Sequence, residues 1–189
     1  MFKSLTTQWV AQKAKQAVSR RMIEPWTLDP KERKVLFVLP GEMAENRAFW
    51  QFIGKLQIRP SGLQFVVITP TVVFIPPAYI SRSFLLKPED LTTLGMPKRE
   101  ILDRTWRGKP EMAIDLHTRF NPVSALLVGA SSAKFRIGPL SEESDPYYDL
   151  MLEYDAHSVV DHETLALLEK RLRVLEPRPL VFKPTYALI

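Results

Sequence analysis

The chain has 189 residues, 46% of them hydrophobic and 25% charged, which suits one domain with a buried core and excludes wholesale disorder, a collagen-like chain and a coiled coil. The formal net charge is +5, and no apolar run approaches the roughly 20 residues of a membrane-spanning helix. With no cysteine and three histidines, we expect no disulfide, no thiolate nucleophile, no metal site and no cofactor.

A basic segment opens the chain. Its five cations equal the net charge of the whole protein, and it holds no acidic residue. They are Lys3, Lys13, Lys15, Arg20 and Arg21. Apolar residues at three- and four-residue steps predict an amphipathic helix over residues 4–23. Four roles remain open for this helix: docking on this protein or on a partner, RNA binding, contact with a membrane surface through Trp9, and a cleavable organellar transit peptide.

Two strands and a helix are predicted next. Residues 34–39 form a continuous apolar run rather than an alternating one, which predicts a strand buried on both faces of a parallel sheet, and residues 63–69 repeat the signal with β-branched side chains. Pro40-Gly41-Glu42 ends the first strand, and apolar residues at helical spacing over 49–56 predict a helix that packs on the sheet. Residues 71–75 form a shorter β-prone piece.

The following segment carries the densest basic patch of the body. A short strand at 84–87, a proline-led helical turn at 88–90 and a helix at 97–106 are predicted here. The patch consists of Lys98, Arg99, Arg104, Arg107 and Lys109, with Trp106 among them. Such a patch can clamp the phosphates of RNA and stack a base. Alternatively it is a solvated helix face whose Arg104 and Arg107 pair at four-residue spacing with the acidic residues before them. Those acidic residues are Glu100 and Asp103.

Strands and helices continue to alternate from residue 111. Residues 112–116 predict a buried strand, and Asn121 followed by Pro122 is typical of an N-cap and the first residue of a helix. That helix is apolar nearly all round, so we expect it to lie deep against the sheet. Further predicted elements are strands at 134–138 and 148–154 and a last helix that starts after Asp161.

This order of elements predicts a three-layer α/β fold with a mainly parallel sheet, because right-handed crossovers place helices on both of its faces. We expect three parts in the chain. A basic helical arm and connector occupy residues 1–30, the α/β domain occupies 31–176, and an extended tail occupies 177–189.

Candidate site residues follow the predicted strands. In an open α/β sheet, ligands bind beyond the C-terminal ends of the strands, where the strand order reverses. This rule singles out Gly41, Glu42, Asp115, His117 and Arg119 as ligand-binding candidates. Asp115 and His117 are the catalytic candidates, because an Asp–His pair two residues apart can share a hydrogen bond and act as a general base. The structural alternative is that the pair ends a strand and satisfies nearby backbone groups. The sequence shows neither a nucleophile nor a glycine-rich phosphate loop that would complete a catalytic set.

Several short motifs resemble a known family. They are Met112-Ala113-Ile114-Asp115-Leu116, Ala133-Lys134-Phe135-Arg136-Ile137-Gly138 and Tyr147-Tyr148-Asp149-Leu150-Met151, with Phe2-Lys3-Ser4-Leu5 and Trp9 before them. Together they resemble a family of uncharacterised Bacteroidota proteins classed as a domain of unknown function. The resemblance implies a Rossmann-like domain with a basic N-terminal helix and supplies no catalytic residues. Residues 114–138 are more distantly similar to the N-terminal half of heptosyltransferase-type glycosyltransferases, which implies a lone half without its donor site.

We therefore expect a non-enzymatic α/β adaptor that docks through its basic helix onto a larger anionic assembly, RNA or a ribonucleoprotein. Two alternatives stay open: a glycosyltransferase-like or nucleotide-binding enzyme half that acts with a partner, and a membrane-surface scaffold. We expect a cytoplasmic location, with organellar import as the alternative. Residues 137–169 carry nine carboxylates and neither Lys nor Arg, so a contact between the basic helix and this segment would remove the case for an external polyanion.

Overall fold

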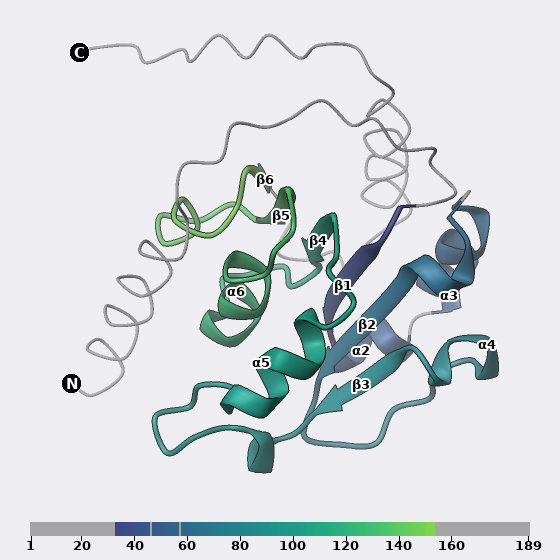
Figure 1. Ribbon diagram of the computed structural model, residues 1–189, viewed down its shortest axis with the longest axis horizontal. Coiled ribbons are helices and arrows are strands. Elements are labelled where there is room, and N and C mark those ends of the chain that lie inside the picture. Colours follow the sequence, from purple (N-terminus) through teal and green to yellow (C-terminus); the bar gives the residue numbers. More distant parts are fainter. Residues whose placement is uncertain (1–32, 46, 57, 154–189) are drawn as a thin grey trace, which may run out of the picture.

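Six parallel strands form one sheet in the order β3-β2-β1-β4-β5-β6 in the computed structural model, which describes residues 33–45, 47–56 and 58–153 (Figure 1). The strands are β1 Val35–Pro40, β2 Leu63–Ile68, β3 Ser83–Leu86, β4 Met112–Asp115, β5 Phe135–Pro139 and β6 Leu150–Leu152. The chain builds outward from β1 to β3, returns to β4 and builds outward again to β6. The strand order therefore reverses between β1 and β4, as in a Rossmann-like sheet.

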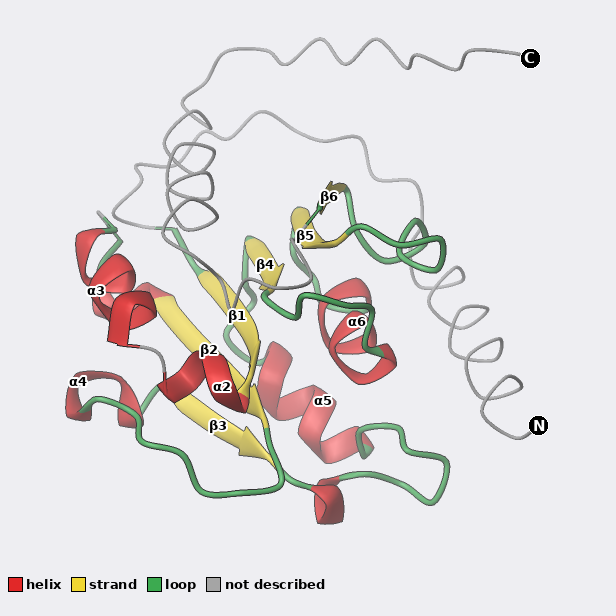
Figure 2. Cartoon of the chain, turned by 180° about the vertical axis from the view of Figure 1, so that it is seen from behind, coloured by secondary structure: helices red, strands yellow, loops and turns green. Residues whose placement is uncertain are grey.

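Helices pack on both faces of the sheet, as Figures 1 and 2 show from opposite sides. The α-helices are α2 Gly41–Glu45, α3 Arg47–Lys55, α4 Pro77–Ile80, α5 Arg99–Trp106 and α6 Pro122–Gly129, and the 3₁₀ turns are η2 Pro60–Gly62 and η3 Pro88–Asp90. Helices α2 and α3 belong to one hydrophobic cluster, whereas α5 and α6 belong to the other. The predicted three-layer, parallel α/β fold is confirmed.

Side chains of β1 alternate between these two clusters. Phe37 packs with α3 on one face, and Leu36 and Val38 pack with α6 on the other. All three are fully buried, which explains why this strand is apolar at every position. The rings of Phe37 and Phe65 stack at 5.5 Å, a type of contact that adds about 0.5–1.5 kcal/mol to the burial of apolar area.

Helix α6 begins as its sequence predicts. The Asn121 side-chain oxygen accepts hydrogen bonds from the backbone N–H groups of Val123 at 2.9 Å and Ser124 at 3.3 Å, and Pro122 takes the first helical position. The helix is buried along nearly its whole length. At its end, Gly129 lies so close to Tyr147 that a Cβ atom would collide with the ring. The expectation of a deeply placed helix is confirmed.

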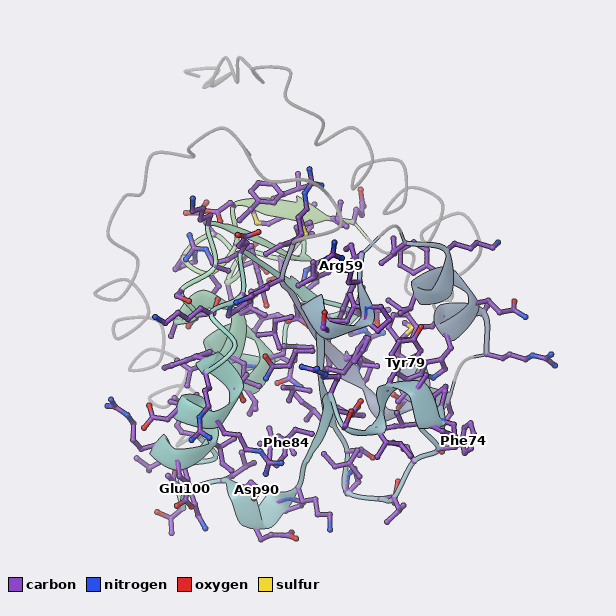
Figure 3. All side chains as sticks on the ribbon, turned by 45° about the vertical axis from the view of Figure 1, so that its right-hand side comes forward. Arg59, Phe74, Tyr79, Phe84, Asp90 and Glu100 are labelled. Atoms are coloured by element: carbon purple, nitrogen blue, oxygen red, sulfur yellow. The ribbon has the colours of Figure 1, made fainter. Side chains whose placement is uncertain are left out.

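The β-prone piece at 71–75, whose sequence left its structure ambiguous, does not join the sheet. This segment forms no strand, and Val72 and Phe74 are 82% and 70% exposed; Figure 3 shows Phe74 at the periphery of the molecule. Prolines at positions 70, 76 and 77 flank it, and they remove the N–H groups that a strand would need at its ends.

The other elements were predicted to within a few residues, with three differences. The last strand covers Leu150–Leu152 rather than 148–154, and α2 and α4 were not predicted. The predicted N-terminal helix, last helix and tail, together with both domain boundaries, lie outside the described residues.

Candidate functional site

Asp115 is the centre of a buried hydrogen-bond cluster at the C-terminal end of β4. Its Oδ1 accepts a hydrogen bond from the His117 backbone N–H at 3.0 Å and lies 2.7 Å from His117 Nδ1. Its Oδ2 accepts hydrogen bonds from Ser124 Oγ and Tyr148 Oη, both at 2.5 Å. Both oxygens of this carboxylate therefore accept hydrogen bonds from the protein itself. We call Asp115, His117, Ser124 and Tyr148 the Asp115 cluster.

Three neighbouring elements bring the Asp115 cluster together. Asp115 pairs with Val38 of β1, and the hydrogen bond that the His117 backbone N–H donates to its carboxylate forms a tight local turn after the strand. Ser124 lies in the first turn of α6. Tyr148 comes from the loop between β5 and β6 and reaches Asp115 across Gly138, where a Cβ atom would collide with the Tyr148 ring. The cluster thus joins β4, α6 and the β5–β6 loop.

The geometry of His117 allows one kind of chemistry. With an ionised Asp115 and a neutral imidazole, the 2.7 Å contact places the imidazole proton on Nδ1 and leaves Nε2 as an acceptor, the arrangement of a general base. The residue is only 9% exposed. Ser124 donates to Asp115 rather than to His117, so the serine is not arranged as a nucleophile beside its base. The predicted Asp–His hydrogen bond is present, and its partners also fit a structural role at the end of a strand.

The remaining ligand-binding candidates lie around the same edge of the sheet. Gly41 starts α2 directly after β1, and a Cβ atom there would meet Thr69 Oγ1 at 2.8 Å, at the end of β2. Glu42 and Arg119 are exposed. The reversal of strand order between β1 and β4 therefore gathers the predicted residues at one edge, and within this group hydrogen bonds join Asp115 to His117.

Tyr147 lies beside the cluster with an unusual hydroxyl. The side chain is fully buried, and within the described residues its Oη has no hydrogen-bond partner. Burial raises the pKa of Tyr147 to about 12, because the phenolate would be poorly solvated there. The hydroxyl of the neighbouring Tyr148, by contrast, donates a hydrogen bond to Asp115, so one of these two adjacent tyrosines has a partner for its hydroxyl and the other has none within the described residues.

The basic patch of α5 is divided in the structure. Arg99 pairs with Asp103 at 3.0 Å, so the predicted pairing of Asp103 with Arg107 is wrong. The guanidinium of Arg104 lies 4.3 Å above the Phe84 ring of β3 rather than against Glu100, and Figure 3 shows where Phe84 lies. The Trp106 indole donates to the Leu127 carbonyl at 3.0 Å, so this side chain ties α5 to α6.

A cavity that the sequence did not predict lies at the opposite edge of the sheet, where β1, β2 and β3 begin. Its volume is about 390 Å³, and its charged residues are Lys34, Arg82, Arg104 and Arg107. Two of these belong to the predicted patch. The other two carry a signal that was available, since each directly precedes a strand and the starts of parallel strands lie together.

Within the described ranges, no group of three His, Asp or Glu residues is placed to hold a metal ion. None of the helices in this part of the chain is long and apolar enough to cross a membrane.

Comparison with known proteins places the chain in one family. The model described as "Family of unknown function (DUF6913)" matches residues 7–170, and the chain belongs to this family. The curated proteins contain no match to the chain, and neither do the solved structures.

Proposed function

We propose that this member of the DUF6913 family is a non-enzymatic adaptor, whose α/β domain carries a basic N-terminal segment that binds RNA or a ribonucleoprotein. Its main support is the distribution of charge. Residues 1–23 hold five cations and no carboxylate, whereas the 21 basic and 21 acidic residues of the remainder balance. A cationic segment of this kind binds phosphates by releasing their counterions, without reading a sequence.

The Asp115 cluster supports the non-enzymatic part of the proposal. Both carboxylate oxygens receive donors from the protein itself, and the cluster ties together β4, α6 and the β5–β6 loop. Such a network stabilises one arrangement of the fold without needing a substrate.

Filter binding with ribosomal RNA fragments tests the proposal. In one variant of the full chain, the five cations of residues 1–23 are replaced by glutamine. We expect this variant to bind RNA at least tenfold more weakly than the wild type at about 100 mM salt, because up to five phosphate contacts are lost.

A matched control removes the same charge from the body. It replaces five cations that lie outside the basic segment and the cavity, namely Arg47, Lys55, Arg59, Lys87 and Lys134, by glutamine. We expect this control to keep most of the RNA affinity. Equal losses in both variants would reduce the effect to net charge and reject a special role for the basic segment.

A second candidate function is supported by the strand order. The Asp115–His117 pair lies at the reversal between β1 and β4, where α/β enzymes bind nucleotides, and the likeness to heptosyltransferase-type enzymes leads to the same suggestion. In that case a sugar nucleotide raises the melting temperature of the wild type, and His117→Ala abolishes the rise. A screen of sugar nucleotides that leaves the melting temperature unchanged would exclude this function.

A further inference from the structure

The cavity at the starts of β1, β2 and β3 carries charge of one sign. Lys34, Arg82, Arg104 and Arg107 are among the residues that line it, and no Asp or Glu of the described part of the chain does. Among the described residues none of these four forms an ion pair. Asp103, the acidic residue of α5 nearest to Arg104 in the sequence, is paired with Arg99 instead. Four cationic residues thus line one space of about 390 Å³, and no described residue pairs with any of them.

The C-terminal end of α5 explains only part of this charge. Arg104 and Arg107 suit the negative end of the helix, and Arg104 is further held above the Phe84 ring at 4.3 Å. Lys34 and Arg82 come from elsewhere, directly before β1 and β3. Bringing four like charges to one cavity costs free energy, and a bound anion offsets this cost.

The wall of the cavity is also partly apolar. Val35 and Leu63, each 2% exposed, line it together with Phe84. Sites for small molecules commonly have volumes of about 300–1,000 Å³ and combine an apolar wall with a few convergent polar groups. This cavity is at the small end of that range, so it has room for a single small ligand.

We propose that this cavity binds a small phosphorylated molecule, with its phosphate among the four cations and its organic part against Val35, Leu63 and Phe84. A phosphate monoester carries a charge of about −1.5 to −2 at neutral pH, and its oxygens match the forked N–H groups of arginine. A simple carboxylate would neutralise only one of the four cations. The inference does not depend on RNA binding, because it uses no residue of the basic segment.

Isothermal titration calorimetry on the full chain tests this assignment. The probes are inorganic pyrophosphate, the nucleoside diphosphates ADP and UDP, and adenosine as a probe without phosphate. We expect pyrophosphate to bind at one site per chain, at least one nucleoside diphosphate to bind more tightly, and adenosine to show no binding at 1 mM. Failure of all phosphorylated probes to bind at 1 mM would overturn the proposal.

Variants locate the bound phosphate. We expect Arg82→Gln combined with Arg107→Gln to weaken pyrophosphate binding at least tenfold, whereas the matched control Arg47→Gln with Lys55→Gln leaves it unchanged. Thermal unfolding of each variant verifies that the fold is intact. Binding that survives in the cavity variant but is lost in Arg119→Gln would place the phosphate at the opposite edge of the sheet and overturn the assignment.

Competition with a single-stranded RNA oligonucleotide distinguishes a small phosphorylated ligand from the phosphate backbone of RNA as the occupant of the cavity. We expect pyrophosphate to leave RNA affinity unchanged, because the polymer uses other residues. Displacement of RNA by pyrophosphate, together with loss of RNA binding in the Arg82 and Arg107 variant, would show that the cavity holds a polymer phosphate and would contradict a small-molecule ligand.

Discussion

Two adjacent tyrosines should respond in opposite directions to the same substitution. The Tyr147 hydroxyl is fully buried and has no hydrogen-bond partner within the described residues, so Tyr147→Phe removes a polar group that costs free energy in the folded state. We expect this change to raise the free energy of unfolding by about 1 kcal/mol, the lower end of the cost of an unsatisfied buried group.

Tyr148→Phe should do the reverse. The Tyr148 hydroxyl donates to Asp115 Oδ2 at 2.5 Å, and hydrogen bonds to charged groups contribute about 1.5–3 kcal/mol, so the free energy of unfolding should fall by that amount. The two variants should therefore differ by roughly 2.5 kcal/mol or more. Urea unfolding followed by circular dichroism measures both. Changes of the same sign, or a difference below about 1 kcal/mol, would refute the role assigned to the Asp115 cluster.

Three further predictions concern the same region and its surroundings. Gly138→Ala should lower the free energy of unfolding by about 1–3 kcal/mol, because the added Cβ collides with the Tyr148 ring. Gly54→Ala in α3, which has open space around it, should instead raise the free energy of unfolding by about 0.5–1 kcal/mol. Urea unfolding that shifts both variants in the same direction would contradict this. Asn121→Ala should cost about 1 kcal/mol through loss of the α6 cap, and an unchanged midpoint would exclude the cap. Burial raises the pKa of Tyr147 from 10.0 to about 12, so between these pH values the unfolded chain ionises this residue before the folded protein does, and the free energy of unfolding should fall as the pH rises from 10 toward 12. Tyr147→Phe should lack that part of the alkaline loss, and identical alkaline profiles would contradict it.

The sheet could be predicted because its signals are local. An apolar residue at every position of β1 follows from burial on both faces, and the Asn121-Pro122 pair determines where α6 begins. The segment at 71–75 was ambiguous because β-propensity favours a strand wherever β-branched residues gather. There the flanking prolines decide the outcome instead, since they remove backbone donors.

Half of the Asp115 cluster was predictable from the sequence. Asp115 and His117 are only two positions apart, so their contact is local: β4 ends at Asp115, and the turn that follows brings the imidazole to the carboxylate. Ser124 and Tyr148 lie 9 and 33 positions from Asp115, and they meet it only after α6 and the β5–β6 loop have packed. The cavity could not be predicted for the same reason, because Lys34 and Arg82 come together only through the pairing of β1, β2 and β3.

The salt dependence of RNA affinity tests the proposed adaptor most directly. The slope of log Kobs against log salt counts the phosphates that the protein neutralises, at about −0.7 for each contact with a single strand. If the basic segment makes the attachment, replacing its five cations with glutamine should make the slope shallower by up to about 3.5, with little change in the body control. A slope that is the same with and without those five cations would contradict the proposal, whatever the absolute affinity.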